Sequence, residues 1–302
     1  MTETQKLIKS ICDEENIKFN LVSKDWIIIL EKDNKTRFIS GYKFGLNNHA
    51  LGLICDDKYA LFDVLSHFNI KVSEYYIVFN NYDRNKILEY ANKYNYHLVV
   101  KSNVGTCGND VYRVNNEIEL FEIIDKLLIK SHSISLSPYY DIKNEYRSII
   151  YNDNIELFYG KKRPIVIGDG NKTVYELLLE FNNYYFSKLK DHSNLDYILE
   201  KDKLYEYSWQ HNLSKGSIPF YIEDEEIKNK VQNLALEVSN KLKLSFASID
   251  IIELTNGDIM VLEVNSGVMM DNFINIMNEG KTIAKEIYRK AILALFKENT
   301  WN

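Results

Sequence analysis

The sequence IDIIELTNGDIMVLEVN at residues 249–265 has the pattern of a β-hairpin. Two apolar runs flank Asn256-Gly257, a dipeptide that favours the tight turn between paired strands. Side chains alternate between the two faces of a strand, so Glu263 and Asn265 share a face at the end of the second run. If Asp250 in the first run points to that face as well, two carboxylates and an amide oxygen converge.

Carboxylate and amide oxygens on rigid strands suit Mg²⁺, which binds through a few carboxylates together with substrate phosphates. We therefore predict a metal site formed by Asp250, Glu263 and Asn265, for Mg²⁺ or alternatively Mn²⁺, beside a nucleotide. The competing interpretation is an ordinary hairpin whose acids are merely solvated, so the decision depends on the rest of the chain.

The composition is that of a folded protein of 302 residues, 45% apolar and 26% charged, which is long enough for two or three lobes. A net charge of -6 argues against nucleic acid as a partner. No apolar stretch approaches the roughly 20 residues of a membrane span, and the N-terminus lacks the apolar core of a secretion signal. Cys12, Cys55 and Cys107 are odd in number and far apart, which fits a reducing compartment. We expect a cytoplasmic protein with no nucleic-acid or membrane partner.

The pattern of predicted strands and helices favours an α/β class with α+β lobes, divided into three lobes. Residues 1–92 alternate strands and helices and are expected to form an N-terminal α/β lobe. Residues 93–140 are expected to form a central lobe that covers a nucleotide, and residues 141–302 a C-terminal lobe with the metal site.

A second candidate motif is the loop that follows Lys101 and contains Gly105 and Gly108. Glycines let backbone N–H groups approach phosphates closely, and the lysine adds a positive charge. The loop is not a P-loop, because G-x-x-x-x-G-K-[ST] is absent and a strand rather than a helix follows. The alternative is an ordinary glycine-rich turn.

Together these segments resemble the ATP-grasp superfamily, most closely the module found in cyanophycin synthetases and bifunctional glutathione synthetases. The resemblance covers about residues 95–297 and rests on five segments in the family's order. They are VVK with its glycine loop at 99–108, PYY and EYRSII at 138–150, VIGDGNKTVYEL at 166–177, NLSKG at 212–216, and the D…E-x-N pattern of Asp250, Glu263 and Asn265.

The resemblance implies a nucleotide set and a catalytic set beside the metal set. The nucleotide set would contact the phosphates, the adenine and the ribose, and consists of Lys101, Gly105, Thr106, Gly108, Tyr139, Tyr140 and Glu145. The catalytic set would contact the phosphoryl or acyl-phosphate group, and consists of Arg147, Lys162 and Asn212. Lys162 represents the basic run 161–163, which could also be a solvated face. Residues 267–271 would line the side of the acceptor.

The implied activity is that of an ATP-dependent carboxylate–amine ligase, which forms an amide or peptide bond through an acyl phosphate. Its cofactors would be ATP and Mg²⁺, its substrates amino acids or peptides, and by analogy it would form a homodimer. The alternatives are a non-catalytic nucleotide-binding scaffold or regulator, and a kinase that transfers phosphate without forming an amide. The sequence departs from the family pattern at Ser137, Ser217 and Trp209-Gln210-His211. These departures affect the expected contacts to the acceptor more than the expected contacts to the nucleotide.

Overall fold

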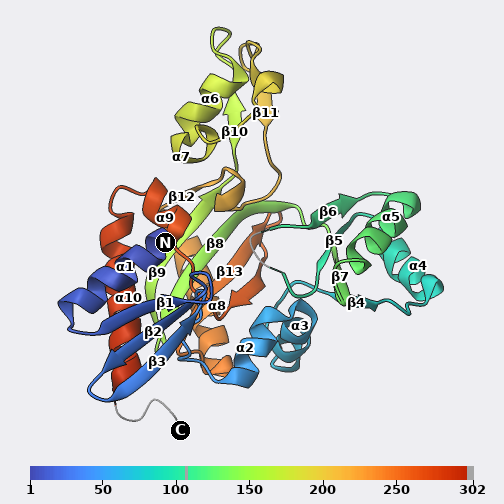
Figure 1. Cartoon of the computed structure of the whole chain (residues 1–302). Coiled ribbons are helices and arrows are strands. Elements are labelled where there is room, and N and C mark those ends of the chain that lie inside the picture. The colour runs from blue at the N-terminus through green and yellow to red at the C-terminus, as the bar shows by residue number, and fades with distance from the viewer. Residues whose placement is uncertain (106–107, 298–302) are drawn as a thin grey trace.

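The computed structural model describes residues 1–105 and 108–297. They fold around a five-stranded antiparallel sheet with the strand order β12-β9-β8-β13-β14 (Figure 1). Its strands are β8 (Ile142–Tyr151), β9 (Asn154–Lys162), β12 (Ile218–Phe220), β13 (Phe246–Leu254) and β14 (Ile259–Asn265). One face of the sheet is buried under helices α2 (His49–Asp56), α3 (Lys58–His67) and α8 (Glu225–Leu242). One end of the other face is buried under α1 (Glu3–Glu14), α9 (Asp271–Ile276) and α10 (Gly280–Phe296). The rest of that second face carries the charged residues described below.

The predicted hairpin is confirmed as β13 and β14, joined by a turn in which Gly257 has a φ of +86°. Asp250 lies opposite Glu263, and Ser248 lies opposite Asn265. Residues that lie opposite each other on antiparallel strands project to the same face, so the two acids and the amide share one face, as the alternation predicted. The register shifts after Asp250, where Ile251 lies opposite Val261.

A four-stranded antiparallel sheet with the order β4-β7-β5-β6 forms the central lobe. Its strands are β4 (Tyr76–Phe79), β5 (Leu98–Ser102), β6 (Val111–Val114) and β7 (Ser133–Pro138), and α4 (Arg84–Lys93) and α5 (Glu117–Leu128) pack on one face. The expected boundary at residue 92 therefore divides a continuous core, because β4 and α4 belong to this lobe. The pairing of β4 with β7 joins segments far apart in sequence, which no local pattern reveals.

The N-terminal region is divided among three parts of the fold instead of forming one α/β lobe. Strands β1 (Lys18–Val22), β2 (Ile27–Lys32) and β3 (Lys35–Ser40) form an antiparallel sheet that shares a core with α1 and α10. Helices α2 and α3 instead join the core of the five-stranded sheet, and residues from 76 onward join the central lobe. Among the described residues, no helix has the combination of length and hydrophobicity needed to cross a bilayer.

A satellite lobe with its own small core projects from the five-stranded sheet, in yellow at the top of Figure 1. It consists of β10 (Ile165–Ile167), α6 (Val174–Phe181), α7 (Asn183–Phe186), the 3₁₀ turn η1 (Ser193–Leu195) and β11 (Leu204–Glu206). The chain returns to the main sheet through a second 3₁₀ turn, η2 (Leu213–Lys215). Thr173 caps α6 through the capping box that the sequence indicates. Phe186, Leu195 and Leu199 are buried, so the polar stretch that contains them is a folded part of this lobe.

Candidate active site

The centre of the site is an ion network on the open face of the five-stranded sheet. Strand β8 lies between β9 and β13, with Arg147 opposite Asp250 and Glu145 opposite Lys161. The Arg147 guanidinium donates two hydrogen bonds to Asp250, 2.8 Å from Nε to Oδ1 and 2.6 Å from Nη2 to Oδ2. The Lys161 ammonium bridges the two acids, 2.9 Å from Oδ1 of Asp250 and 2.5 Å from Oε1 of Glu145. Side chains from three neighbouring strands are thus held in one arrangement.

Burial and neighbouring charges set the ionisation of these acids. Burial opposes the charge on Asp250, but Arg147 and Lys161 outweigh it and hold the pKa of Asp250 well below its usual range. Burial raises the pKa of Glu145, although Lys161 acts in the opposite direction. The network therefore keeps Asp250 ionised and holds two cations in place within a buried site.

Two lysines, Lys58 and Lys101, lie beside Glu263, between the five-stranded and the four-stranded sheets. Lys101 on β5 donates to Oε1 of Glu263 at 3.2 Å and to the Tyr75 hydroxyl at 2.9 Å, so this hydrogen bond to Glu263 joins the two sheets. Lys58, at the start of α3, donates to the backbone carbonyls of Asn103 and Gly105. Burial lowers the pKa of Lys58, and the Glu263 carboxylate opposes that effect. These contacts place positive charge directly beneath the glycine loop.

The glycine loop reaches across the cleft to the segment that contains Asn212. Gly108 has a φ of +64°, and a Cβ placed there would lie 2.5 Å from Nδ2 of Asn212 and 3.4 Å from Oε1 of Gln210. The Oδ1 atom of Asn212 accepts from Ser214, which fixes the side chain in the turn η2. Gly105 is described, whereas Thr106 lies outside the described residues.

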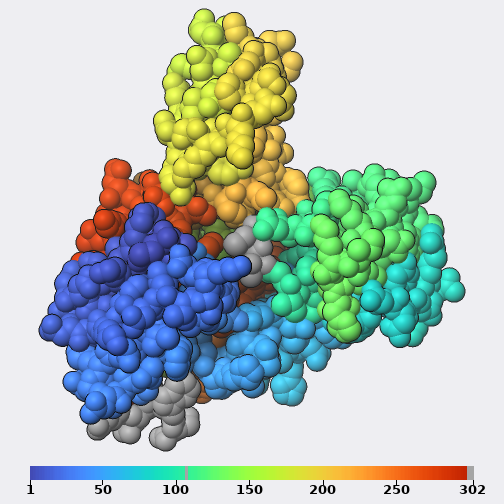
Figure 2. Space-filling view, viewed as in Figure 1, coloured from blue at the N-terminus to red at the C-terminus, as the bar shows by residue number. Residues whose placement is uncertain are grey.

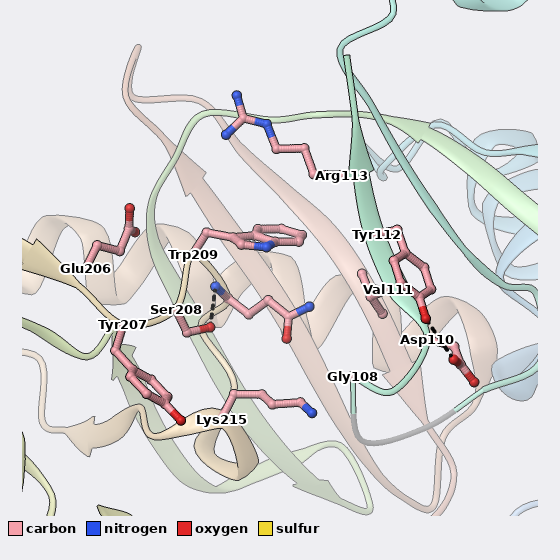
Figure 3. Close-up of a pocket in the computed structure, with 11 residues that line it drawn as sticks. Gly108, Asp110, Val111, Tyr112, Arg113, Glu206, Tyr207, Ser208, Trp209 and Lys215 are labelled. Atoms are coloured by element: carbon pink, nitrogen blue, oxygen red, sulfur yellow. Dashed lines mark hydrogen bonds between the residues drawn. The ribbon is translucent and has the colours of Figure 1, made fainter. Parts of the chain in front are cut away.

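A cavity of about 560 Å³ lies between the end of the loop, strand β6 and the returning segment (Figure 3). Its lining is mixed in charge and aromatic, and consists of Gly108, Asp110, Val111, Tyr112, Arg113, Glu206, Tyr207, Ser208, Trp209, Gln210 and Lys215. The space-filling view shows the surface hollowed where the N-terminal, central and satellite lobes meet (Figure 2). A ligand bound here can contact Gly108 at the end of the glycine loop.

With ATP as the substrate that the resemblance implies, we predict that Gly108→Ala lowers kcat/KM for ATP by about 10-fold or more, because the added methyl group disturbs the contact with Asn212. Steady-state ADP release measures the effect. Gly257→Ala is the matched control: Gly257 also has a positive φ, of +86°, but nothing lies within 4 Å of its Cβ position. Both changes strain the backbone by about 1–2 kcal/mol, so equal activity losses would contradict a specific role for Gly108.

Of the two tyrosines predicted to contact adenine, Tyr139 packs against residues that line this cavity. The Tyr139 ring stands between Arg113, whose guanidinium carbon is 4.0 Å from the ring centroid, and Trp209, whose ring is 5.8 Å away. The N–H of Tyr139 already donates to the carbonyl of His97 at 2.8 Å, so it is engaged in the fold. The Tyr140 hydroxyl accepts from the backbone N–H of Glu74.

The three residues before Asn212, which depart from the pattern of the ATP-grasp superfamily, are closely packed. Trp209 and Gln210 line the cavity, whereas His211 is buried. Burial, together with the charges of Arg163 and Lys161, lowers the pKa of His211 to about 3. His211 is therefore neutral at physiological pH. The hydroxyl of Ser217 donates to the carbonyl of Gln210 and holds this segment in place.

The structure places Arg147 against Asp250 and Lys101 against Glu263, but it does not bring Lys162 into the network. Lys162 is exposed, and its ammonium lies 6.0 Å from the ring of Phe181, whereas its neighbour Lys161 lies in the network. Alternation along β9 allows only one of the two lysines to face Asp250. Lys58 was also missed, because its burial depends on contacts with Asn103 far along the chain.

The donor set fits a hard divalent ion that is completed by phosphate oxygens. Glu263 and Asn265 are partly exposed on the face that carries Asp250. Within the described ranges, no group of three or more His, Cys, Asp or Glu side chains converges on one point. Two carboxylates and one amide are consistent with Mg²⁺, which keeps water and substrate ligands, and they do not form an all-protein cage.

Comparisons with known proteins agree with this geometry. Residues 204–290 match the RimK-like ATP-grasp domain family. A bifunctional glutathione synthetase from Pasteurella multocida is similar in structure, with a TM-score of 0.58 and 17% identity, over 96% of this chain and 44% of that protein. The D-alanine–D-alanine ligase from Bacillus anthracis, also solved as a complex with ATP, has TM-scores of 0.56 at 17% identity.

These similarities show the fold of the chain, but they do not show its activity. The ligase matches cover 83–84% of this chain and 69–72% of the ligase, whereas the chain spans less than half of the glutathione synthetase. No curated protein sequence matches the chain. Residues 204–290 thus match the RimK-like ATP-grasp family, and the solved structures show that the chain has the ATP-grasp fold.

Proposed function

We propose that the protein is an ATP-dependent carboxylate–amine ligase that forms an amide or peptide bond between amino acids or peptides. The observation that carries this proposal is the charge arrangement in the cleft. Four cations (Lys58, Lys101, Arg147 and Lys161) lie among three carboxylates (Glu145, Asp250 and Glu263), and Lys58 also contacts the carbonyl of Gly105 in the glycine loop. Such a site can neutralise a polyphosphate while its acids retain a divalent ion.

In this proposal Lys58, Lys101 and the glycine loop (Gly105, Thr106 and Gly108) hold the phosphates of ATP. The hinge residues Tyr139 and Tyr140 and the Glu145 carboxylate accommodate the base and the ribose. Asp250, Glu263 and Asn265 would hold Mg²⁺ or Mn²⁺, which would neutralise charge on the transferred phosphoryl group. Arg147 and Asn212 face that group, and Lys161 takes the role that the sequence suggested for Lys162.

The reaction follows from the chemistry of carboxylates. A carboxylate is a poor electrophile, so transfer of the γ-phosphoryl group first converts it to an acyl phosphate with a good leaving group. An amine then attacks the acyl carbon, and phosphate leaves. Because water competes with the amine, closure of the glycine loop over the site protects the intermediate.

The deciding experiment incubates the protein with Mg-ATP and pools of amino acids and short peptides, and measures ADP and phosphate release together with product masses. A product whose mass equals both substrates minus water, formed only with both present, supports the ligase. A phosphorylated product that persists without an amine indicates a kinase. ATP binding without turnover for any pool indicates a scaffold or regulator. A homodimer in the cytoplasm is part of the proposal, and light scattering tests the oligomeric state.

A further inference from the structure

The segment that follows Asn265 is held by hydrogen bonds to parts of the chain that are far away in sequence. The N–H of Val268 donates to the carbonyl of Tyr42 at 3.1 Å, and the carbonyl of Val268 accepts from the Tyr288 hydroxyl at 2.9 Å. The N–H of Met270 donates to the same hydroxyl at 3.1 Å. Two backbone groups of this segment therefore depend on one side chain of α10.

Tyr288 is itself fixed by packing in the core. Its side chain is buried, and its ring stacks on that of Phe44, with the ring centroids 5.5 Å apart and the planes 10° apart. Burial raises the pKa of Tyr288, so the hydroxyl keeps its proton and can donate to Val268 while it accepts from Met270. A phenylalanine at this position would keep the packing and remove only the hydrogen bonds.

The N-terminal helix α1 holds the end of the same segment. Figure 1 shows α1 beside α9 and α10, with which it shares a core. Asp271, the first residue of α9, accepts from the N–H of Thr4 at 3.1 Å and from the Thr4 hydroxyl at 2.8 Å. That hydroxyl also lies 3.1 Å from the Tyr288 hydroxyl. A carboxylate is favoured at the first turn of a helix, where N–H groups are unpaired, so Thr4, Asp271 and Tyr288 form one stable cluster.

The orientation of Asn265 depends on the chain on both of its sides. Asn265 is the last residue of β14, opposite Ser248, so the sheet fixes the chain before it but not the chain after it. Within the residues that the structure describes, the side-chain amide of Asn265 has no hydrogen bond of its own. The link to Val268 is closely packed, because a Cβ on Gly267 would lie 3.5 Å from Cβ of Tyr42. The cluster therefore fixes the backbone that carries the amide.

We propose that Tyr288 and Thr4 are positioning residues of the metal site, and that by holding the segment after Asn265 they fix the amide that would bind the divalent ion. Groups that orient a metal ligand without touching the ion commonly change metal affinity by about 10–100-fold. Thr4 lies outside the 95–297 region that carries the family motifs and outside the 204–290 match. The N-terminal helix thus contributes to the site from beyond the motif pattern. This inference rests on the proposed function for the metal assignment, but ion binding can be tested without turnover.

The test measures how much Mn²⁺ tightens the binding of ADP, by equilibrium dialysis of labelled ADP with either Mn²⁺ or EDTA. We expect Tyr288→Phe and Thr4→Val to reduce this gain in affinity by about 10-fold or more, with the affinity for ADP in EDTA unchanged. Thr4→Ser keeps the hydroxyl and should retain the gain.

Tyr146→Phe is the matched control for the loss of a buried tyrosine hydroxyl. Tyr146 is 2% exposed, and its hydroxyl donates to Glu253 at 2.6 Å. It belongs to the core on the face of the five-stranded sheet that α2, α3 and α8 cover. Its replacement should therefore lower the thermal unfolding midpoint but leave the Mn²⁺ gain unchanged.

The outcomes separate this inference from the ligase proposal. An undiminished gain in either folded variant, Tyr288→Phe or Thr4→Val, would overturn the inference, as would an equal loss in Tyr146→Phe or Thr4→Ser. A matching loss of ADP affinity in EDTA would show general damage to the fold and would also overturn it. If Tyr288→Phe does not fold, the comparison of Thr4→Val with Thr4→Ser decides alone.

The wild-type protein supplies the remaining distinction. If it shows no Mn²⁺ gain, the inference is wrong even where an amide forms. If it shows the gain, the variants lose it and no amide forms with any substrate pool, the ligase proposal fails and the positioning role stands.

Discussion

Replacing Glu263 by glutamine is expected to lower turnover by about 10²–10³-fold while the fold stays intact. Glutamine keeps the size of the side chain but removes the charge that pairs with Lys101 and that would hold the divalent ion. Glu263 is partly exposed, so its loss leaves the core of the sheet unchanged. Single-turnover ADP release measures the chemical step, and circular dichroism with thermal unfolding measures the fold.

Asp258→Asn provides the control on the same hairpin. Asp258 lies in the turn and pairs with Lys71 at 3.0 Å on the surface, so its neutralisation should leave turnover unchanged. Raising the Mg²⁺ concentration should partly restore the Glu263→Gln variant if the lost interaction is with the ion. Full activity in Glu263→Gln would show that the metal assignment to this hairpin is wrong.

Asp250→Asn is expected to reduce the free energy of unfolding by about 3–5 kcal/mol. The change preserves volume but leaves Lys161, which is buried, and Arg147, which is largely buried, without the carboxylate that both contact. Removing one member of a buried network costs more than the network itself contributes, because the remaining charges stay desolvated. Urea denaturation should show a lower midpoint at an unchanged slope. Asp258→Asn again serves as control, and an effect no larger than that of the control would contradict the network as an element of stability.

The difference in stability between wild type and Asp250→Asn depends on pH, and the sign of that dependence is definite. The folded protein holds the pKa of Asp250 well below its usual range, so its contribution to stability is complete above the unfolded value of about 3.9. The contribution falls as pH decreases towards the folded pKa, where wild-type Asp250 becomes neutral like asparagine. Burial raises the pKa of Glu145, which has the opposite effect on stability; the Asp250 charge adds to this rise in wild type, so the effect of Glu145 is smaller in the variant. We expect the wild-type and variant midpoints to differ by a constant amount from pH 5 to 7 and to converge in strong acid; a constant difference at all pH values would argue against ionised Asp250 as the cause.

Short-range patterns in the sequence predicted the elements that now define the site. The hairpin of β13 and β14 followed from its turn dipeptide, and the common face of Asp250, Glu263 and Asn265 followed from alternation. Similarly, the strand–loop–strand pattern after Lys101 identified the loop that contains Gly108. The order of motifs also indicated the ATP-grasp fold, which the structural similarities confirm.

By itself, the sequence determined those features that depend on neighbours within a few residues: strand, turn, face and motif order. Only the tertiary structure decided which lysine of the 161–163 run enters the network, that Lys58 lies beneath the loop, and that β4 joins the central sheet. Each of these depends on contacts between residues distant in the chain, where burial and charge pairing select one face or one partner. A local pattern can predict that a cationic side chain is buried. The packing of the whole fold determines which carboxylate lies beside it.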